Sequence, residues 1–208
     1  MTIAGEVHFE DPPGATPLDD DDVAGLIPTW VATRGDLDTA EQENILTAMV
    51  WAFTARRRWS AARILDRQTL ADLHRRMFGE VWQWAGSWRQ REANVGVSPR
   101  QVVTELENLL GDVQAQTADP ARLAWPPDEV AVRFHHRLVL IHSFPNGNGR
   151  HARLAADLLV VALRRPRFTW GAGGDLSSNT SARGEYLSAL RTADRDYDFA
   201  PLLRFARS

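Results

Sequence analysis

The sequence of 208 residues contains no cysteine, which excludes disulfide bonds, thiolate metal sites and cysteine nucleophiles. It also contains no lysine, so every basic side chain is an arginine, and this excludes a P-loop and other lysine chemistry. No apolar run approaches the roughly 18 residues that a membrane span needs. The first 22 residues have neither the basic start nor the apolar stretch of a secretory signal. We therefore expect a cytoplasmic protein with no membrane contact.

The balance of charges is close to neutral. The chain has 24 basic and 27 acidic side chains, a net charge of −3, and no basic stripe that would predict binding to nucleic acid. Hydrophobic residues make up 44% and charged residues 25%, which is ordinary for a globular protein. This length and composition predict one domain with a sizeable core.

The organisation of the chain follows from its turn residues and its apolar spacing. Residues 1–35 are rich in proline, glycine and aspartate and are expected to form an extended segment, with the acidic run Asp19–Asp22 as a solvated turn. Residues 36–208 are expected to form the domain, and Asp38 is the expected N-cap of its first helix, with Glu41 completing a capping box. The periodicity predicts a mainly α protein with a short helix near the end and helices at 38–58, 66–79, 99–116, 127–141, 150–164 and 179–193.

One segment departs from the helical period. In "VWQWAGSWRQREANVGV" the apolar residues partly alternate and Gly86 interrupts them, which indicates a small irregular β-hairpin or extended flap between residues 86 and 98. A tryptophan-rich core loop explains the same pattern nearly as well.

The stretch "IHSFPNGNGRHARLAADLL", residues 141–159, places a glycine-rich turn before a helix that should begin near Arg150. Backbone N–H groups of such a turn, followed by a helix N-terminus, form an anion-binding nest. Arg150 and Arg153 lie on one face of the first turn, where the helix dipole disfavours a cation by about 0.3–1 kcal/mol. They would be explained by a polyphosphate ligand, or equally well by pairing with nearby carboxylates. His142, at the end of the preceding helix, faces the same space and is a candidate general base, although a structural histidine is the simpler interpretation.

At this point the sequence resembles a known family. "HSFPNGNGRHAR" is similar to the Fic motif, H-x-F-x-[D/E]-G-N-G-R-x-x-R, at all but one of its specified positions. The segments "VWQWAGSWR", "FHHRLVLIH" and "RGEYLSALRTAD" also resemble the family, and with "GATPLDDDD" and "LDTAEQENI" they look most like its subfamily called mobile mystery protein B. The resemblance spans residues 14–205. It implies a Fic fold, a helical bundle with a small β-hairpin flap, and a protein adenylyltransferase that transfers AMP from ATP to a Tyr, Thr or Ser hydroxyl of a target protein.

The resemblance also implies roles for individual residues. His142 would be the general base, Phe144 would anchor the loop in the core, and Arg153 would hold the γ-phosphate. The flap near residues 88–98 would align a segment of the target protein as an added strand. The remaining nucleotide-binding residues would be those of the anion hole, Gly147, Asn148 and Gly149 with Arg150, and those of the adenine pocket, Arg183 and Tyr186.

Asn146 is the departure from the family motif. Its position is usually an acidic residue that holds the Mg²⁺ bridging the phosphates. An asparagine carbonyl still ligates a hard cation but adds no negative charge. We therefore expect Mg²⁺ or Mn²⁺ to be held weakly by Asn146 and mainly by the phosphates of ATP.

The six residues "TAEQEN" resemble the Fic inhibitory motif, [S/T]-x-x-x-E-[G/N], with Thr39, Glu43 and Asn44 at its specified positions. In that family the glutamate of a helix opposes the second arginine of the catalytic motif, here Arg153, and the chain inhibits itself. On a helical wheel Glu43 borders an apolar arc and is expected to be partly buried, and the arc consists of Ile45, Leu46, Met49, Val50 and Phe53. The alternative is that Glu43 is an ordinary residue solvated at its tip.

Three other functions stay open from the sequence. Within the same class, the enzyme could remove AMP, with Glu43 positioning a water, or could use another nucleotide or phospho-containing donor. From a different class, the chain could be a nucleotide sensor without catalysis, for which His142 would have little use. The sequence identifies neither the target protein nor the oligomeric state.

Overall fold

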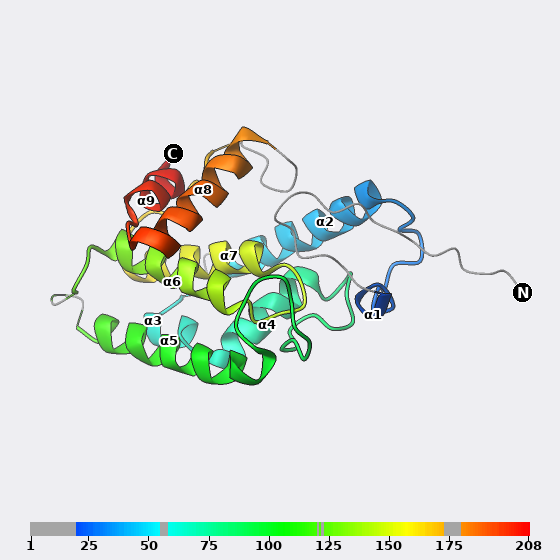
Figure 1. The fold of residues 1–208 in the computed structure, drawn as a ribbon, viewed down its shortest axis with the longest axis horizontal. Coiled ribbons are helices and arrows are strands. Elements are labelled where there is room, and N and C mark those ends of the chain that lie inside the picture. Colours follow the sequence, from blue (N-terminus) through cyan, green and yellow to red (C-terminus); the bar gives the residue numbers. More distant parts are fainter. Residues whose placement is uncertain (1–19, 55–57, 120, 122, 173–179) are drawn as a thin grey trace, which may run out of the picture.

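The computed structural model describes residues 20–54, 58–119, 121, 123–172 and 180–208, which form a helical bundle (Figure 1). The prediction of a mainly α fold is confirmed. Residues 1–19, most of the expected extended segment together with Asp19, lie outside the described residues. The helices are α1 (Asp20–Val23), α2 (Arg34–Phe53), α3 (Ala61–Ile64), α4 (Arg67–Phe78), the 3₁₀ turn η1 (Pro99–Gln101), α5 (Val102–Thr117), α6 (Pro127–Ile141), α7 (Asn148–Ala162), α8 (Ser181–Asp196) and α9 (Ala200–Arg207).

Helix α7 forms the centre of the bundle. It is buried on nearly every side, and its alanines at 152, 155 and 156 have no exposed surface, so neighbouring helices approach closely. Helix α6 packs along α7; α4 contacts both α7 and α2, while α8 packs on α9 at the opposite side (Figure 1). The loop that joins α6 to α7 therefore lies between these two flanks, and this loop is the glycine-rich segment singled out above.

Helix α2 begins four residues before the predicted start at Asp38. Thr33 is its N-cap: the Thr33 hydroxyl accepts from the Asp36 N–H at 3.2 Å, and the Asp36 carboxylate accepts from the Thr33 N–H at 2.9 Å. The capping box exists, but it is Thr33 with Asp36 instead of Asp38 with Glu41.

The face that α2 buries is also not the predicted apolar arc. Leu46 and Val50 are 50% and 69% exposed, and the buried residues are Leu37, Ala40, Glu41, Asn44, Ala48 and Ala52. Small alanines let α2 lie close to α4, and the polar members of this face have partners that offset their burial. The Asn44 amide, for example, donates to Arg76 O at 2.9 Å and accepts from the Glu80 N–H at 3.0 Å.

The expected β-hairpin between residues 86 and 98 is wrong. This segment consists of turns and bends, and the β-type pairing seen in the described part of the chain is one isolated bridge between Leu26 and Trp82. The alternative interpretation, a tryptophan-rich core loop, fits the tryptophans but not the whole segment: Trp82 is buried and Trp88 stacks on Phe144, with ring centroids 5.0 Å apart, whereas residues 90–92 and 94–96 are exposed.

The backbone groups of this segment bond to the α6–α7 loop instead of to one another. The Arg89 N–H donates to Ser143 O at 2.9 Å and the Val97 N–H to Ile141 O at 3.4 Å. The Arg89 side chain, 4% exposed, donates to the carbonyls of His142, Arg91 and Val97. Because one guanidinium binds three carbonyls, few acceptors remain for a strand ladder.

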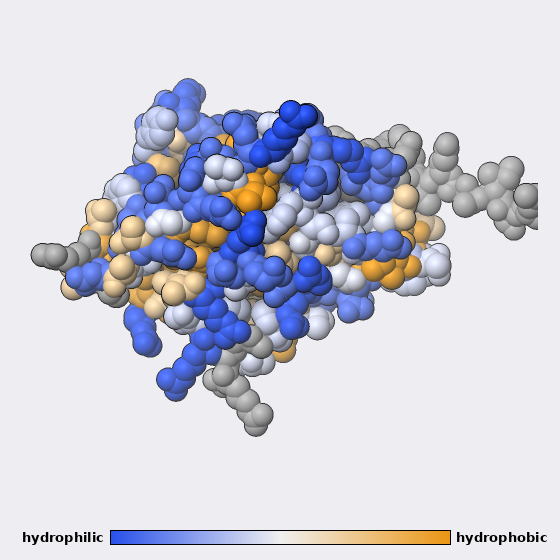
Figure 2. Space-filling model, turned by 90° about the horizontal axis from the view of Figure 1, so that it is seen from below, coloured by the Kyte–Doolittle hydropathy of each residue, from blue (hydrophilic) through white to orange (hydrophobic). Residues whose placement is uncertain are grey.

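The surface carries no single dominant apolar face in the view of Figure 2, where hydrophobic residues reach the surface in separate areas among hydrophilic ones. Within the described ranges, every helix is too short or too polar to cross a membrane.

Candidate active site

The α6–α7 loop is held in shape by its own side chains. Helix α6 ends at Ile141, and His142 caps it in the left-handed conformation, with φ of 54°. Phe144 is buried. The Asn148 amide binds the backbone of Phe144 twice, accepting from its N–H at 2.9 Å and donating to its carbonyl at 2.7 Å. Of the predicted anion-hole residues, Asn148 therefore uses its side-chain carbonyl and its amide nitrogen to fix the loop.

Gly147 turns the chain into α7. Its φ is 75°, and a Cβ at this position would lie 2.5 Å from the Phe78 ring, so both the turn and the close approach require glycine. No side chain caps α7. The first N–H groups of a helix have no partner within it, so the backbone of Asn148 and Gly149 presents donors at the positive end of the helix dipole.

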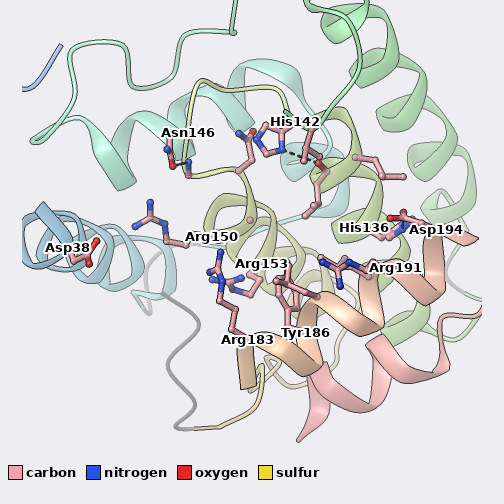
Figure 3. Close-up of a pocket in the computed structure, with 18 of the residues that line it drawn as sticks. Asp38, His136, His142, Asn146, Arg150, Arg153, Arg183, Tyr186, Arg191 and Asp194 are labelled. Carbon is pink, nitrogen blue, oxygen red and sulfur yellow. Dashed lines mark hydrogen bonds and ion pairs between the residues drawn. The ribbon is translucent and has the colours of Figure 1, made fainter. Parts of the chain in front are cut away.

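A cleft of about 340 Å³ opens at this helix terminus (Figure 3). It brings together every residue predicted for catalysis, for metal binding and for nucleotide binding: His142, Asn146, Gly147, Asn148, Gly149, Arg150, Arg153, Arg183 and Tyr186. The three residues predicted for inhibition, Thr39, Glu43 and Asn44, do not line it.

His142 lies at one wall of the cleft and is 8% exposed. Its Nδ1 faces Val139 O at 3.3 Å, and its backbone carbonyl accepts from Arg89 Nε at 2.6 Å. A Cβ at Gly96 would lie 2.6 Å from the His142 Cβ, so the 86–98 segment closes over this residue only because Gly96 is a glycine. Burial lowers the pKa of His142 to about 4, although the hydrogen bond to the Val139 carbonyl acts to raise it. The imidazole is thus neutral at physiological pH and, with its proton on Nδ1, has an acceptor nitrogen for a substrate proton.

Arg150 forms an ion pair with α2. Its Nη1 lies 2.5 Å from Glu41 Oε2, and the Glu41 side chain is 4% exposed. The other oxygen, Oε1, accepts from Trp82 Nε1 at 2.7 Å. Glu41 is therefore the carboxylate of α2 that reaches Arg150, one of the two arginines predicted to bind phosphate, whereas the sequence analysis gave Glu41 only a capping role.

The predicted inhibitory residues have other environments. Glu43 is exposed, so its expected partial burial is wrong and the solvated alternative holds. The Thr39 hydroxyl donates to Gly35 O at 2.8 Å, within its own helix. Since the buried face of α2 carries Glu41 and Asn44, Glu43 points away from the cleft, and the described contacts do not join it to Arg153.

Arg153 is held by Tyr186. Its guanidinium carbon lies 5.3 Å from the centre of the Tyr186 ring. Burial raises the pKa of Tyr186, and the charge of Arg153 and its hydrogen bond to the hydroxyl oppose that rise. The same hydroxyl lies 3.0 Å from His135 Nε2. Among the described residues Arg153 forms no ion pair with a carboxylate, so the carboxylate alternative for the two arginines is correct for Arg150 alone.

Replacing Tyr186 by phenylalanine is expected to weaken ATP binding roughly 3- to 10-fold, because Arg153 loses the hydroxyl that orients it while the ring remains. Affinity for AMP should stay unchanged, since Arg153 is predicted to bind the terminal phosphate. Isothermal titration of both nucleotides measures the difference. Equal weakening of ATP and AMP would show that Tyr186 supports the cleft as a whole.

The other end of the cleft was not predicted. There His136 Nε2 lies 2.7 Å from Asp194 Oδ1, and Leu187, Leu190 and Arg191 complete the lining (Figure 3). The sequence did contain a signal for this end of the cleft. Positions 187, 190, 191 and 194 have helical spacing, so they share one face of the predicted helix next to Tyr186.

The described residues of the cleft do not form a binding site for magnesium. The Asn146 Oδ1 accepts from the Gly147 N–H at 2.6 Å, so the one predicted ligand is turned onto its own loop. Asp38 and Asp194 also line the cleft, but they pair with Arg34 and His136. The described residues hold no group of three or more His, Cys, Asp or Glu side chains suited to a metal. This donor set does not fit a resident divalent ion.

Comparison with known proteins agrees with this site. Residues 64–160 match the model of the Fic/DOC family, and this range includes the loop, His142 and both arginines. The matched region, just under half of the chain, is thus similar to the Fic/DOC family. The matched region begins at the last residue of α3 and includes most of α7, so α2 with Glu41 and α8 with Tyr186 flank it.

Relatives and solved structures extend the likeness. The chain is 30% identical over 141 residues to protein adenylyltransferase fic-1 of Caenorhabditis elegans, which covers 65% of this chain and 25% of the relative. This chain thus spans about a quarter of the length of the curated relatives it matches. Its fold is similar to that of Fic-1 from C. elegans, with TM-score 0.62, 24% identity and coverage of 89% and 50% of the two chains. It is also similar to BepC from Bartonella tribocorum with bound AMPPNP, with TM-score 0.63, 16% identity and coverage of 91% and 97%. These likenesses establish the Fic fold.

Proposed function

We propose that the chain transfers AMP from ATP to a Tyr, Thr or Ser hydroxyl of a target protein. The observation that carries this proposal is the meeting of a buried neutral histidine, His142, with an uncapped helix N-terminus and two arginines in one cleft. A neutral histidine can accept a proton from a nucleophile, and a helix N-terminus with two arginines can bind a polyphosphate. The relatives named protein adenylyltransferase support the reaction type, and the AMPPNP in the BepC structure supports a nucleoside triphosphate as donor.

The proposed reaction uses the residues of this chain as follows. Backbone N–H groups at the start of α7 bind the phosphates, and Arg153 binds the terminal one. His142 takes the proton of the target hydroxyl as its oxygen bonds to the α-phosphorus. The bond from that phosphorus to the bridging oxygen breaks, and pyrophosphate leaves with negative charge that the arginine and the helix terminus stabilise. A target segment would reach His142 along residues 88–98, whose Val95 lines the cleft.

We further propose that the protein inhibits itself through Glu41. The Glu41 carboxylate binds the guanidinium of Arg150, which the phosphates would otherwise bind. Inhibition would thus come from α2, as the resemblance implied, but through another glutamate and the other arginine. The likeness to mobile mystery protein B remains a proposal that rests on its quoted segments.

Transfer of label from ATP to protein tests the proposed function. With ATP labelled at the α-phosphate the protein itself or a protein of a cell lysate should become labelled, and with ATP labelled at the γ-phosphate it should not. Label from the γ-phosphate alone would indicate phosphoryl transfer. With nucleotide bound but neither label transferred by the wild type or by Glu41→Gln, which removes the proposed inhibitory charge, the proposal fails and a nucleotide sensor becomes the better explanation.

A further inference from the structure

We infer that His74, outside the Fic motif, is a positioning residue that aims the Gly147 N–H into the cleft. The inference rests on the proposed function in one respect, that the cleft binds the phosphates of a nucleotide. His74 lies on α4 and has no exposed surface.

Three parts of the chain meet at the His74 ring. Its Nε2 lies 3.0 Å from the backbone carbonyl oxygen of Asn146, its Nδ1 lies 3.0 Å from the backbone nitrogen of Gly86, and its face stacks on Phe144 with ring centroids 3.8 Å apart. The ring therefore connects α4, the turn that contains Gly86, and the α6–α7 loop.

These partners determine which ring nitrogen carries the proton. The Gly86 N–H can only donate, so Nδ1 of His74 is the acceptor. A neutral imidazole carries its single proton on the other nitrogen, and Nε2–H consequently donates to the Asn146 carbonyl. Burial keeps the ring neutral, because it lowers the pKa of His74 well below the usual value for histidine.

Holding the Asn146 carbonyl fixes the direction of the next N–H. The C=O of Asn146 and the N–H of Gly147 belong to one planar trans peptide, so they point in opposite directions. With the oxygen drawn into the core by His74, the Gly147 N–H points toward the cleft, where Asn146 Oδ1 now accepts from it at 2.6 Å. A phosphate oxygen can replace this neutral amide oxygen as the acceptor, and a hydrogen bond to a charged acceptor is the stronger one.

Nucleotide binding by two variants tests the inference. His74→Phe keeps the ring that stacks on Phe144 but removes the donor, whereas His74→Gln keeps an amide that can donate to Asn146 and accept from Gly86. His74→Phe is expected to weaken ADP binding roughly 5- to 20-fold while adenosine binding changes less than about twofold. His74→Gln should restore ADP binding to within about threefold of the wild type. A purely structural role would instead lower the affinity for ADP and adenosine together, and that result would overturn the inference.

The wild-type protein provides a test that does not depend on the folding of a variant. In a ¹⁵N-labelled sample, addition of ADP should shift the Gly147 amide resonance strongly downfield, while adenosine should not. An unchanged Gly147 resonance at saturating ADP would overturn the inference. Neither measurement requires AMP transfer, so a protein that binds ADP in this way but labels nothing would contradict the proposed function and leave the role of His74 intact.

Discussion

Replacing His142 by alanine is expected to lower the rate of AMP transfer roughly 100- to 10,000-fold, the usual contribution of a general base. The affinity for ATP should change by less than about threefold, because an interaction made only in the transition state affects kcat and not ground-state binding. In the proposed reaction the phosphates bind to the α7 terminus and Arg153, which the substitution leaves in place. Measuring kcat with labelled ATP and Kd by titration separates the two quantities. A variant that loses affinity but transfers AMP at the normal rate would remove His142 from the chemistry.

The pH dependence of AMP transfer provides a second test of His142 as the general base. Because the pKa of His142 is about 4, the neutral base is the main species above that pH, and kcat/KM should fall only as the pH drops through about 4. An ordinary surface histidine would cause the loss near its usual value of about 6.5.

His151 provides the matched control for this profile. Burial lowers its pKa to about 4 as well, but its Nε2 lies 3.0 Å from Leu70 O, and it does not line the cleft. For both histidines the pKa in the folded state lies below the unfolded value, so their contribution to stability is present above about pH 6.5 and is lost as the pH falls toward 4. His151→Gln should therefore change the acid stability of the fold but not the profile of kcat/KM.

The central helices and the site were predictable because strong local signals and the tertiary structure agree there. Helix α6 has the predicted bounds of 127–141, and α7 begins two residues before the predicted Arg150. The glycines of the motif are typical of a tight turn into a helix N-terminus, and Gly147 has the positive φ of such a turn. Every predicted nucleotide residue lines one cleft, although Arg183 and Tyr186 were predicted only from the family resemblance.

A helix was correctly predicted at α2, but its buried face was not, because tertiary contacts outweighed its hydrophobic pattern. A helical wheel favours burial of the largest apolar side chains, yet the structure exposes Leu46 and Val50 and buries Glu41. The partners that make this possible, Trp82 and Arg150, lie 41 and 109 residues further along the chain. No local pattern contains contacts at such separations.

The β-hairpin failed for a related reason. Partial alternation of tryptophans is typical of a strand, but these rings pack on Phe144 and on one another, and Arg89 binds the carbonyls of Arg91 and Val97 within the segment. The irregular conformation of residues 86–98 matters for the site, because this segment contacts His142 through Gly96 and Arg89.

Replacing Glu41 by glutamine is expected to raise AMP transfer and ATP affinity roughly 10- to 100-fold, the range that corresponds to one charged hydrogen bond. Glutamine keeps the volume and the acceptor for Trp82 but removes the charge that holds Arg150. Arg150 would then be available to the phosphates. Because the Arg150 side chain is 28% exposed, water can solvate it, and we expect the variant to fold with a modest loss of stability.

Glu43→Gln is the matched control, since it changes the same residue type on the same helix two positions further on. Glu43 is exposed and does not line the cleft, so this variant should have the activity of the wild type. Both variants are compared at limiting and at saturating ATP with α-labelled nucleotide. Activation by Glu43→Gln alone would favour the inhibitory motif as the sequence suggested it and would contradict the contact seen in the structure.

A third possible result decides whether the Glu41–Arg150 pair inhibits transfer or supports it. Glu41 and Trp82 could hold Arg150 in the orientation that phosphates require, in which case Glu41→Gln would lower transfer and weaken ATP binding. The geometry argues against this: Glu41 Oε2 lies 2.5 Å from Arg150 Nη1 and occupies the charged end that a phosphate needs. Two anions compete for one guanidinium, and the second is favoured only when the first is removed or moves away with α2. Activation by Glu41→Gln, together with no effect of Glu43→Gln, would therefore assign the inhibition to the Glu41–Arg150 pair.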